Sequence, residues 1–172
     1  MMRFVMSSSS KRVSKCFIFL FLASLHFGSN AQLLPQDEVK LLQAISDKVE
    51  NLNWKVTQHS CNGDRGFDNR NISRDKSQII RNVTCDCSFN NNTTCHVTSI
   101  ALKGLNISGP IPDEFGNLTR LEILDLTWNN FNGSIPKSLG RLSSVVNLSL
   151  LGNRLTGSIP SEIGDMASLQ EL

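Results

Sequence analysis

The sequence predicts an α/β solenoid, a coil of short repeats with a parallel sheet on its concave face. The convex side is expected to be irregular or 3-10 helical, and a helical, disulfide-bonded cap is expected before the first repeat. Three observations predict this fold. A 24-residue period fills residues 97–172, an amphipathic stretch precedes it, and an even number of cysteines follows a secretory leader. Stacking such units buries one continuous core.

The repeats align without a gap. In each complete unit, positions 1, 4 and 6 are apolar, positions 13 and 20 are glycine, and positions 15 and 16 read Ile-Pro. The three complete units and the start of a fourth are Val97–Arg120, Leu121–Ser144, Val145–Ser168 and Leu169–Leu172. The alternating apolar residues predict a short strand whose inward side chains fill the coil. This period and spacing indicate a leucine-rich-repeat solenoid.

Position 9 of the repeat holds Asn129 and Asn153, whereas the first unit has Leu105 there. A buried amide can hydrogen-bond the backbone where the chain turns out of the strand. We therefore expect an asparagine ladder that begins at the second repeat, because the first repeat of a solenoid is commonly atypical.

Residues 1–31 have the features of a secretory signal peptide. The apolar run Cys16–Phe27 is followed by Ser29-Asn30-Ala31, which predicts cleavage after Ala31. The basic residues before the apolar run are Arg3, Lys11, Arg12 and Lys15. The alternative is an uncleaved signal anchor, but a bilayer core requires about 20 apolar residues and this run is shorter.

Removing the leader changes the charge balance. The whole chain has 17 Lys and Arg against 15 Asp and Glu, a net charge of +2. The leader contains four of the basic residues and none of the acidic ones, so the mature chain has 13 against 15, a net charge of −2. We therefore expect no nucleic-acid partner. The mature sequence also contains no apolar run long enough to predict a transmembrane helix.

Residues 32–96 are predicted to form the N-terminal capping module. Pro35 and the acidic pair that follows it favour the start of a helix. Apolar residues then recur at helical spacing, at Val39, Leu41, Leu42, Ile45 and Val49. A solenoid must cover its first coil, and this amphipathic helix would do so. The polar segment Asn62–Arg81 predicts a surface loop.

Four cysteines remain after cleavage, namely Cys61, Cys85, Cys87 and Cys95. An even number in a secreted chain predicts disulfides, and four cysteines allow three pairings. Cys85 and Cys87 are too close for an easy bridge. The alternative is a metal site with His96 or His59. Secretion and the absence of paired Cys-x-x-Cys spacing argue against it, so we expect no metal, no cofactor and ordinary surface histidines.

The repeat pattern resembles the plant-specific subclass of leucine-rich repeats. Three segments together are similar to the ectodomain start of plant receptor-like serine/threonine kinases that carry a malectin-like domain after the repeats. These segments are Leu34–Val39, Thr84–Cys87 and Glu114–Leu121. The resemblance to the caps of such proteins implies the pairs Cys61–Cys85 and Cys87–Cys95, the second closing a hairpin through Asn90–Asn92.

The sequence has a high density of Asn-x-Ser/Thr sequons, which is typical of a glycosylated secretory protein. The eight candidate asparagines are Asn71, Asn82, Asn91, Asn92, Asn106, Asn117, Asn132 and Asn147. Asn91 and Asn92 overlap, so we expect only one of them to be modified. Asn147 is predicted to lie on the concave sheet, where a glycan would obstruct a ligand.

The concave face is the predicted binding site, because its outward side chains have no packing role. By register, the candidate ligand-binding residues are Ile123, Asp125, Thr127, Trp128, Asn147, Ser149 and Leu151. The first repeat contributes Ser99, Ala101, Lys103 and Gly104, and the third ends with Gly152. Trp128 beside Leu151 and Ile123 would form an apolar patch with an aromatic anchor. Alternatively, Trp128 merely covers the sheet edge.

No catalytic motif is present in the sequence: it lacks a phosphate loop, kinase elements and a histidine within the repeats. We therefore expect an extracellular recognition module, the ectodomain start of a receptor-like kinase without its kinase. Its partner would be a peptide, a wall-derived ligand or a co-receptor. The alternatives are a secreted inhibitor of wall-degrading enzymes and, in the enzyme class, a fragment of a membrane serine/threonine kinase. The uncapped end at Leu169–Leu172 predicts the N-terminal part of a longer protein or a truncated gene model. The expected location is apoplastic, at the plasma membrane if a parent protein has a membrane helix.

Overall fold

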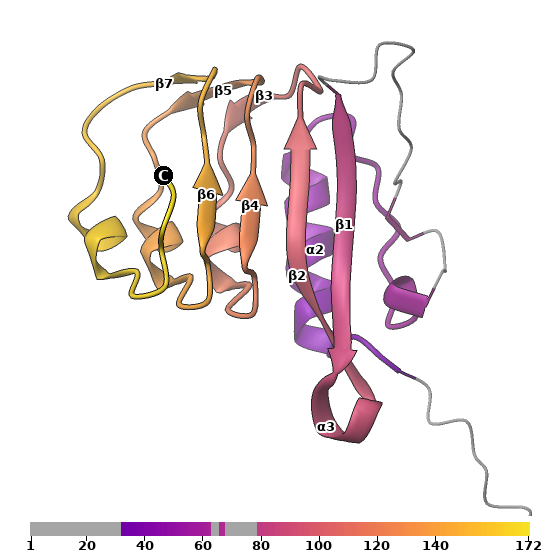
Figure 1. Cartoon of the computed structure of the whole chain (residues 1–172). Helices are drawn as coiled ribbons and strands as arrows, with labels where there is room; N and C mark the ends of the chain where they lie inside the picture. The colour runs from indigo at the N-terminus through magenta and orange to yellow at the C-terminus, as the bar shows by residue number, and fades with distance from the viewer. Residues whose placement is uncertain (1–31, 63–65, 68–78) are drawn as a thin grey trace, which may run out of the picture. The chain divides into compact units, whose positions relative to one another are not determined.

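The computed structural model describes residues 32–62, 66–67 and 79–172 (Figure 1). The predicted signal peptide and Asn71 lie outside these residues. The elements in chain order are α2 (Gln36–Lys48), η1 (Ser60–Asn62), β1 (Ile80–Ser88), α3 (Phe89–Asn92), β2 (Thr94–Lys103), β3 (Ser108–Pro110), η2 (Asp113–Asn117), β4 (Ile123–Asp125), β5 (Asn130–Gly133), η3 (Lys137–Arg141), β6 (Asn147–Ser149), β7 (Arg154–Leu155) and η4 (Ser161–Asp165).

A four-stranded sheet has the order β1-β2-β4-β6. Strand β1 is antiparallel to β2, and β2, β4 and β6 run parallel, as the repeat pattern predicted. Figure 1 shows the three parallel strands side by side. Position 4 of each repeat pairs with position 4 of the next, so the inward side chains Ile100, Leu124 and Leu148 stack in one column and are fully buried.

The asparagine ladder begins at the second repeat, which confirms the prediction. Asn129 Oδ1 accepts hydrogen bonds from Leu105 N at 3.0 Å and Ile107 N at 3.2 Å, and its amide donates to Leu126 O. Asn153 Oδ1 likewise accepts from Phe131 N at 3.1 Å. Each amide therefore satisfies backbone groups of the preceding repeat that no sheet ladder reaches.

A second parallel sheet, with strand order β3-β5-β7, lies where each repeat leaves the first sheet. The repeat pattern predicted an irregular or 3-10 helical convex side and did not predict this sheet. Its strands are two to four residues long, too short for an alternating pattern to show.

The 3-10 helices η2, η3 and η4 form the convex side, as expected. Glycine at position 20 lets them stack closely. A Cβ atom on Gly116 would lie 2.0 Å from Ser138 O, and one on Gly140 would lie 2.4 Å from Glu162 O. These two glycines are therefore required by the close approach of the following repeat.

Helix α2 caps the first repeat through a buried carboxylate. Glu38 Oε1 accepts a hydrogen bond from Val97 N at 2.6 Å, and its Oε2 lies 2.7 Å from His96 Nδ1. Phe89 packs edge-on against the His96 ring, with ring centroids 4.8 Å apart. The expectation that His96 is an ordinary surface group was wrong, because Glu38 and Phe89 enclose it, whereas His59 is exposed.

The cap contains the disulfides Cys61–Cys85 and Cys87–Cys95, the pairing that the resemblance implied. The second closes the β1–β2 hairpin, whose tip Asn90–Asn92 has a left-handed backbone throughout, with φ between 49° and 62°.

The predicted loop Asn62–Arg81 needs correction at its described residues. Ile80 and Arg81 belong to β1, and Arg81 is buried with its Nη2 donating to Asn51 O at 2.8 Å. Phe67 is also buried and packs edge-on against Trp54. The polar composition of the segment gave no sign that Phe67 and Arg81 are buried. Residues 63–65 and 68–78 lie outside the description.

Candidate functional site

The predicted binding residues other than Thr127 gather on one face, the side of the four-stranded sheet opposite its packed interior, which we call the concave face. Position 3 aligns Ser99 with Ile123 and Asn147, and position 5 aligns Ala101 with Asp125 and Ser149. Parallel pairing without a register shift makes these columns straight across the strands. The hydrogen bonds continue past the strand ends, where Trp128 N donates to Leu151 O at 2.9 Å.

Thr127 does not belong to the exposed set, so that prediction was wrong. Thr127 is 9% exposed, and its backbone N–H and hydroxyl both donate to Asp125 Oδ1, at 2.9 and 2.7 Å. Thr127 therefore holds the carboxylate of Asp125 in a fixed orientation on the concave face. Simple alternation failed here because the strand ends at Asp125 and the backbone turns before position 7.

The apolar part of the face consists of Trp128, Leu151 and Ile123, which are 60%, 73% and 43% exposed. Trp128 has a left-handed backbone, with φ 56°. Its ring lies over Gly152, since a Cβ atom there would approach Cε3 and Cδ2 to 2.9 and 3.0 Å. Trp128 thus spans two repeats at the carboxyl ends of the strands.

Asn147 lies on the concave face and is half-buried. Its Oδ1 accepts a hydrogen bond from Ser149 Oγ at 2.7 Å, and its amide donates to Glu171. Glu171 continues the position 3 column, because it forms a parallel bridge with Asn147. The amide nitrogen that a glycan would modify is therefore already engaged with the neighbouring repeat.

The other described sequons are exposed, at Asn82, Asn91, Asn92, Asn106, Asn117 and Asn132. Asn82 pairs with Ala101 across β1 and β2, so its side chain shares the concave face. The repeat register did not predict this second concave sequon, because Asn82 lies on β1, outside the repeats. It lies one strand beyond the first repeat.

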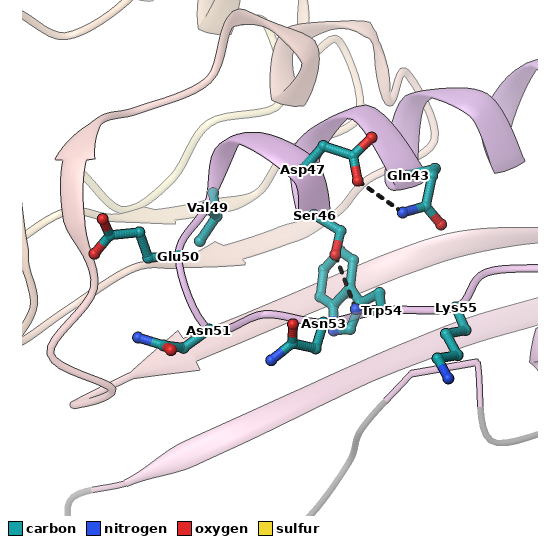
Figure 2. A pocket seen from close by; sticks show the side chains of 9 residues that line it. All are labelled: Gln43, Ser46, Asp47, Val49, Glu50, Asn51, Asn53, Trp54 and Lys55. Atoms are coloured by element: carbon teal, nitrogen blue, oxygen red, sulfur yellow. Dashed lines mark hydrogen bonds between the residues drawn. The ribbon is translucent and has the colours of Figure 1, made fainter.

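A hollow of about 400 Å³ lies in the cap, at the end of helix α2 (Figure 2). It is lined mainly by polar groups, and Gln43 Nε2 donates to Asp47 there. Trp54 lines the hollow with its ring below the helix, and its backbone N–H donates to Ser46 Oγ at 2.8 Å. Within residues 32–62, 66–67 and 79–172, no cluster of three His, Cys, Asp or Glu side chains could hold a metal ion.

A shallow groove of about 770 Å³ crosses the convex flank along the repeated Ile-Pro positions. Lys137 lines it and forms an ion pair with Glu162, with Nζ and Oε1 3.0 Å apart. The pKa of Glu162 is lowered, first by a hydrogen bond from the Glu162 backbone N–H to its carboxylate and second by the Lys137 ammonium. Both side chains are solvated and lie away from the concave face.

Comparison with known proteins agrees with this architecture. The Leucine Rich Repeat family model matches residues 120–142 and 144–166. Two probable LRR receptor-like serine/threonine-protein kinases of Arabidopsis thaliana are similar to most of the chain. One is 40% identical over 121 residues, covering 70% of this chain and 12% of the relative. The other is 44% identical over 113 residues, covering 65% and 11%.

Solved structures give the same result. The BIR3–SERK2 complex from Arabidopsis thaliana aligns with a TM-score of 0.55 at 27% identity, covering 80% of this chain and 66% of that one. The LRR ectodomain of the receptor kinase GASSHO1/SCHENGEN3, solved with CASPARIAN STRIP INTEGRITY FACTOR 2, aligns with a TM-score of 0.53 at 28% identity, covering 77% and 14%. The chain is a leucine-rich-repeat ectodomain segment of the plant receptor type.

This ectodomain segment is a repeat region and not a kinase domain. It spans about an eighth of the length of the receptor-like kinases that it matches. None of the helices in the described part of the ectodomain segment has the length and apolar character to span a bilayer.

Proposed function

We propose that this ectodomain segment binds an extracellular ligand or co-receptor on its concave face, through Ile123, Asp125, Trp128, Ser149 and Leu151. The observation that carries the proposal is the straight alignment of these side chains across β4 and β6, ending at the exposed ring of Trp128. Large exposed apolar side chains beside fixed polar groups are the composition of binding hot spots. Thr127 acts indirectly by orienting Asp125.

The wider context is part of the same proposal. Residues 1–31 are a signal peptide removed after Ala31, residues 32–96 cap the solenoid, and residues 97–172 are plant-type repeats. The mature segment recognises and does not catalyse, and it lies at the apoplastic face of the plasma membrane if its parent has a membrane helix and kinase. The names of the relatives support that parent. A secreted inhibitor of wall-degrading enzymes is the alternative.

The partner is proposed by analogy. One similar receptor ectodomain was solved with CASPARIAN STRIP INTEGRITY FACTOR 2, and the BIR3–SERK2 structure is a complex between two named proteins. A peptide, a wall-derived ligand or a co-receptor ectodomain therefore fits the concave face of this chain, since each would bury the apolar patch of Trp128, Leu151 and Ile123.

The first prediction tests this face with ligand binding to the full ectodomain. Trp128→Ala should weaken binding by at least about 2 kcal/mol, because truncating a hot-spot aromatic costs that much. Asp125→Ala should mainly lower the association rate, since an exposed charge steers encounter. Lys137→Ala on the convex side is the matched control and should be silent. A neutral Trp128→Ala together with a loss at Lys137→Ala would place the site elsewhere.

Glycan removal gives an independent check of the same face. If Asn147 is occupied and borders the ligand, Asn147→Gln should change affinity, whereas Asn71→Gln in the predicted loop should not. Site occupancy is measured by mass spectrometry of the secreted protein. A fully occupied Asn147 with ligand still bound over Ser149 and Leu151 would contradict the assignment.

A further inference from the structure

Position 8 of the repeat requires an unusual backbone. Gly104 and Gly152 have φ values of 68° and 72°, and Trp128, which replaces glycine in the second repeat, has φ 56°. Left-handed backbone disfavours residues with a Cβ atom, and for a bulky side chain it is a genuine outlier. The fold would accept glycine here more readily, so core packing does not account for the tryptophan.

Gly152 makes room for the ring of Trp128. A Cβ atom at residue 152 would lie 2.9 Å from Cε3, closer than real Cβ contacts, and 3.0 Å from Cδ2, at the tight end of their range. The ring therefore rests on the Gly152 backbone, yet Trp128 is 60% exposed. Two neighbouring repeats thus cooperate to hold an aromatic ring at the surface.

We propose that Trp128 and Gly152 form a preorganised aromatic anchor for an apolar side chain of an extended peptide, with Gly152 as the positioning residue. This inference rests on the proposed function of the concave face and specifies its ligand class. Strained backbone persists where the surroundings fix it and is concentrated at binding sites. A ring that is already seated loses little conformational freedom when ligand binds, which favours affinity.

The surroundings of the anchor fit a peptide. Ile80 lies on β1, opposite Lys103 of β2, and is 37% exposed, whereas Leu151 is 73% exposed. Exposed apolar side chains therefore lie on both sides of Trp128. Lys103 and Asp125 add one charge of each sign on β2 and β4. A peptide offers apolar side chains and charges of both signs. A neutral saccharide would leave both charges without a counter-charge.

The positioning role of Gly152 is tested by fluorescence and melting of the secreted chain. Trp54 is only 2% exposed, so quenching by acrylamide reports on Trp128. Gly152→Ala should change this quenching. The matched control is Gly157→Ala, which has φ 80° and only an ordinary contact of 3.8 Å with Ser134 Cβ, and it should leave quenching unchanged. Identical quenching in both variants would overturn the positioning role.

The ligand class is tested with a random linear peptide library displayed on phage. Wild-type protein should select peptides with an apolar side chain, and affinity for a selected peptide should fall at least about 30-fold in Trp128→Ala and in Gly152→Ala. Trp128→Phe should restore binding. Trp128→Gly should melt higher than Trp128→Ala, because glycine relieves the backbone, yet should bind no better.

Failure of the anchor and failure of the proposed face are distinguishable. Peptides that bind wild type and Trp128→Gly equally, but are lost with Asp125→Ala, would overturn the anchor and leave the concave face standing. Selection of oligosaccharides from a glycan array in place of peptides, with sensitivity to Trp128, would overturn the peptide class only. Binding that is insensitive to both Trp128 and Asp125 would overturn the face as well.

Discussion

At the scale of single residues, the fold depends on a few polar side chains that are buried and fully used. Asn129 is 5% exposed and hydrogen-bonds five backbone groups in two repeats, while Glu38 is 8% exposed and joins the cap to the first repeat. Burying a polar group costs little free energy when its hydrogen bonds are satisfied. Removing one partner leaves the other buried groups without hydrogen bonds, which lowers the free energy of unfolding.

The second prediction concerns the ladder. Asn129→Ala should lower the free energy of unfolding by about 2–4 kcal/mol, because several buried backbone groups lose their partners at once. Urea denaturation measures the loss. The control is Asn130→Ala, one residue further on, which should lower the free energy of unfolding much less because the Asn130 amide donates to the exposed side chain of Asn106. Equal losses in the two variants would show that the ladder contributes nothing specific.

Residue-level details divide by what the sequence can reveal. Asn129 was predictable because its role recurs with the period. The burial of Thr127 and the pairing of Glu38 with His96 were not, since both depend on where distant or terminating segments meet. The exposed ring of Trp128 was predictable from register, but its seat on Gly152 was not, because a single sequence gives no backbone angles.

At the scale of elements, the position 20 glycines determine how closely the 3-10 helices stack. Gly116 and Gly140 face the backbone of the next repeat at distances that no Cβ atom tolerates, whereas Gly164 has nothing within 4 Å. The repeat period revealed these glycines in the sequence. Only the structure shows why glycine is required there: the backbone of the next repeat lies against these residues, and no turn is involved.

The third prediction uses this difference. Gly116→Ala should lower the free energy of unfolding by about 1–3 kcal/mol, because an added methyl group in a close-packed contact forces backbone shifts. Gly164→Ala is the matched control. It should be neutral or slightly stabilising, since alanine restricts the unfolded chain. Urea denaturation of both variants checks the prediction, and an equal effect of the two would contradict the stacking role.

The fourth prediction concerns the disulfides, which are 24 and 8 residues apart in sequence. Non-reducing peptide mapping of the secreted protein should find no free thiol among the four cysteines. Replacing Cys61 and Cys85 by serine should cost about 1 kcal/mol more than replacing Cys87 and Cys95, because the longer closed loop restricts the unfolded chain more. Two alkylatable cysteines, or stoichiometric zinc, would contradict the bridges.

At the scale of the whole molecule, the apolar core runs from the cap through the third repeat, and exposed apolar side chains lie on the concave face, at the Ile-Pro position of the third repeat and beyond that repeat. Leu172 is 61% exposed and Ile159 is 60% exposed. Leu169, expected to be uncovered, is partly buried against the core. Its backbone N–H donates to Met166 O in a local turn, the same bond that Leu121 N makes to Leu118 O at the start of the second repeat.

The fifth prediction follows from this exposed end. Appending a polar capping repeat after Leu172 should raise the Tm, because terminal repeats with a polar outer face cover the last coil. One kcal/mol moves the Tm of a domain of this size by about 2–4 °C. Calorimetry and sedimentation measure the effect. An unchanged Tm and a monomeric parent chain would indicate that the partial cover by Leu169 already suffices.

The unshifted register of β2, β4 and β6 has a geometric consequence for any extended ligand that crosses them. Neighbouring strands lie about 4.8 Å apart, and an extended peptide advances about 3.3 Å per residue. Two strand spacings therefore match three ligand residues almost evenly. Successive side chains of an extended peptide point to opposite faces, so of two ligand residues three apart only one would direct its side chain at the receptor. Such a ligand would therefore meet the same repeat position, two strands apart, through a side chain at one place and through its backbone at the other.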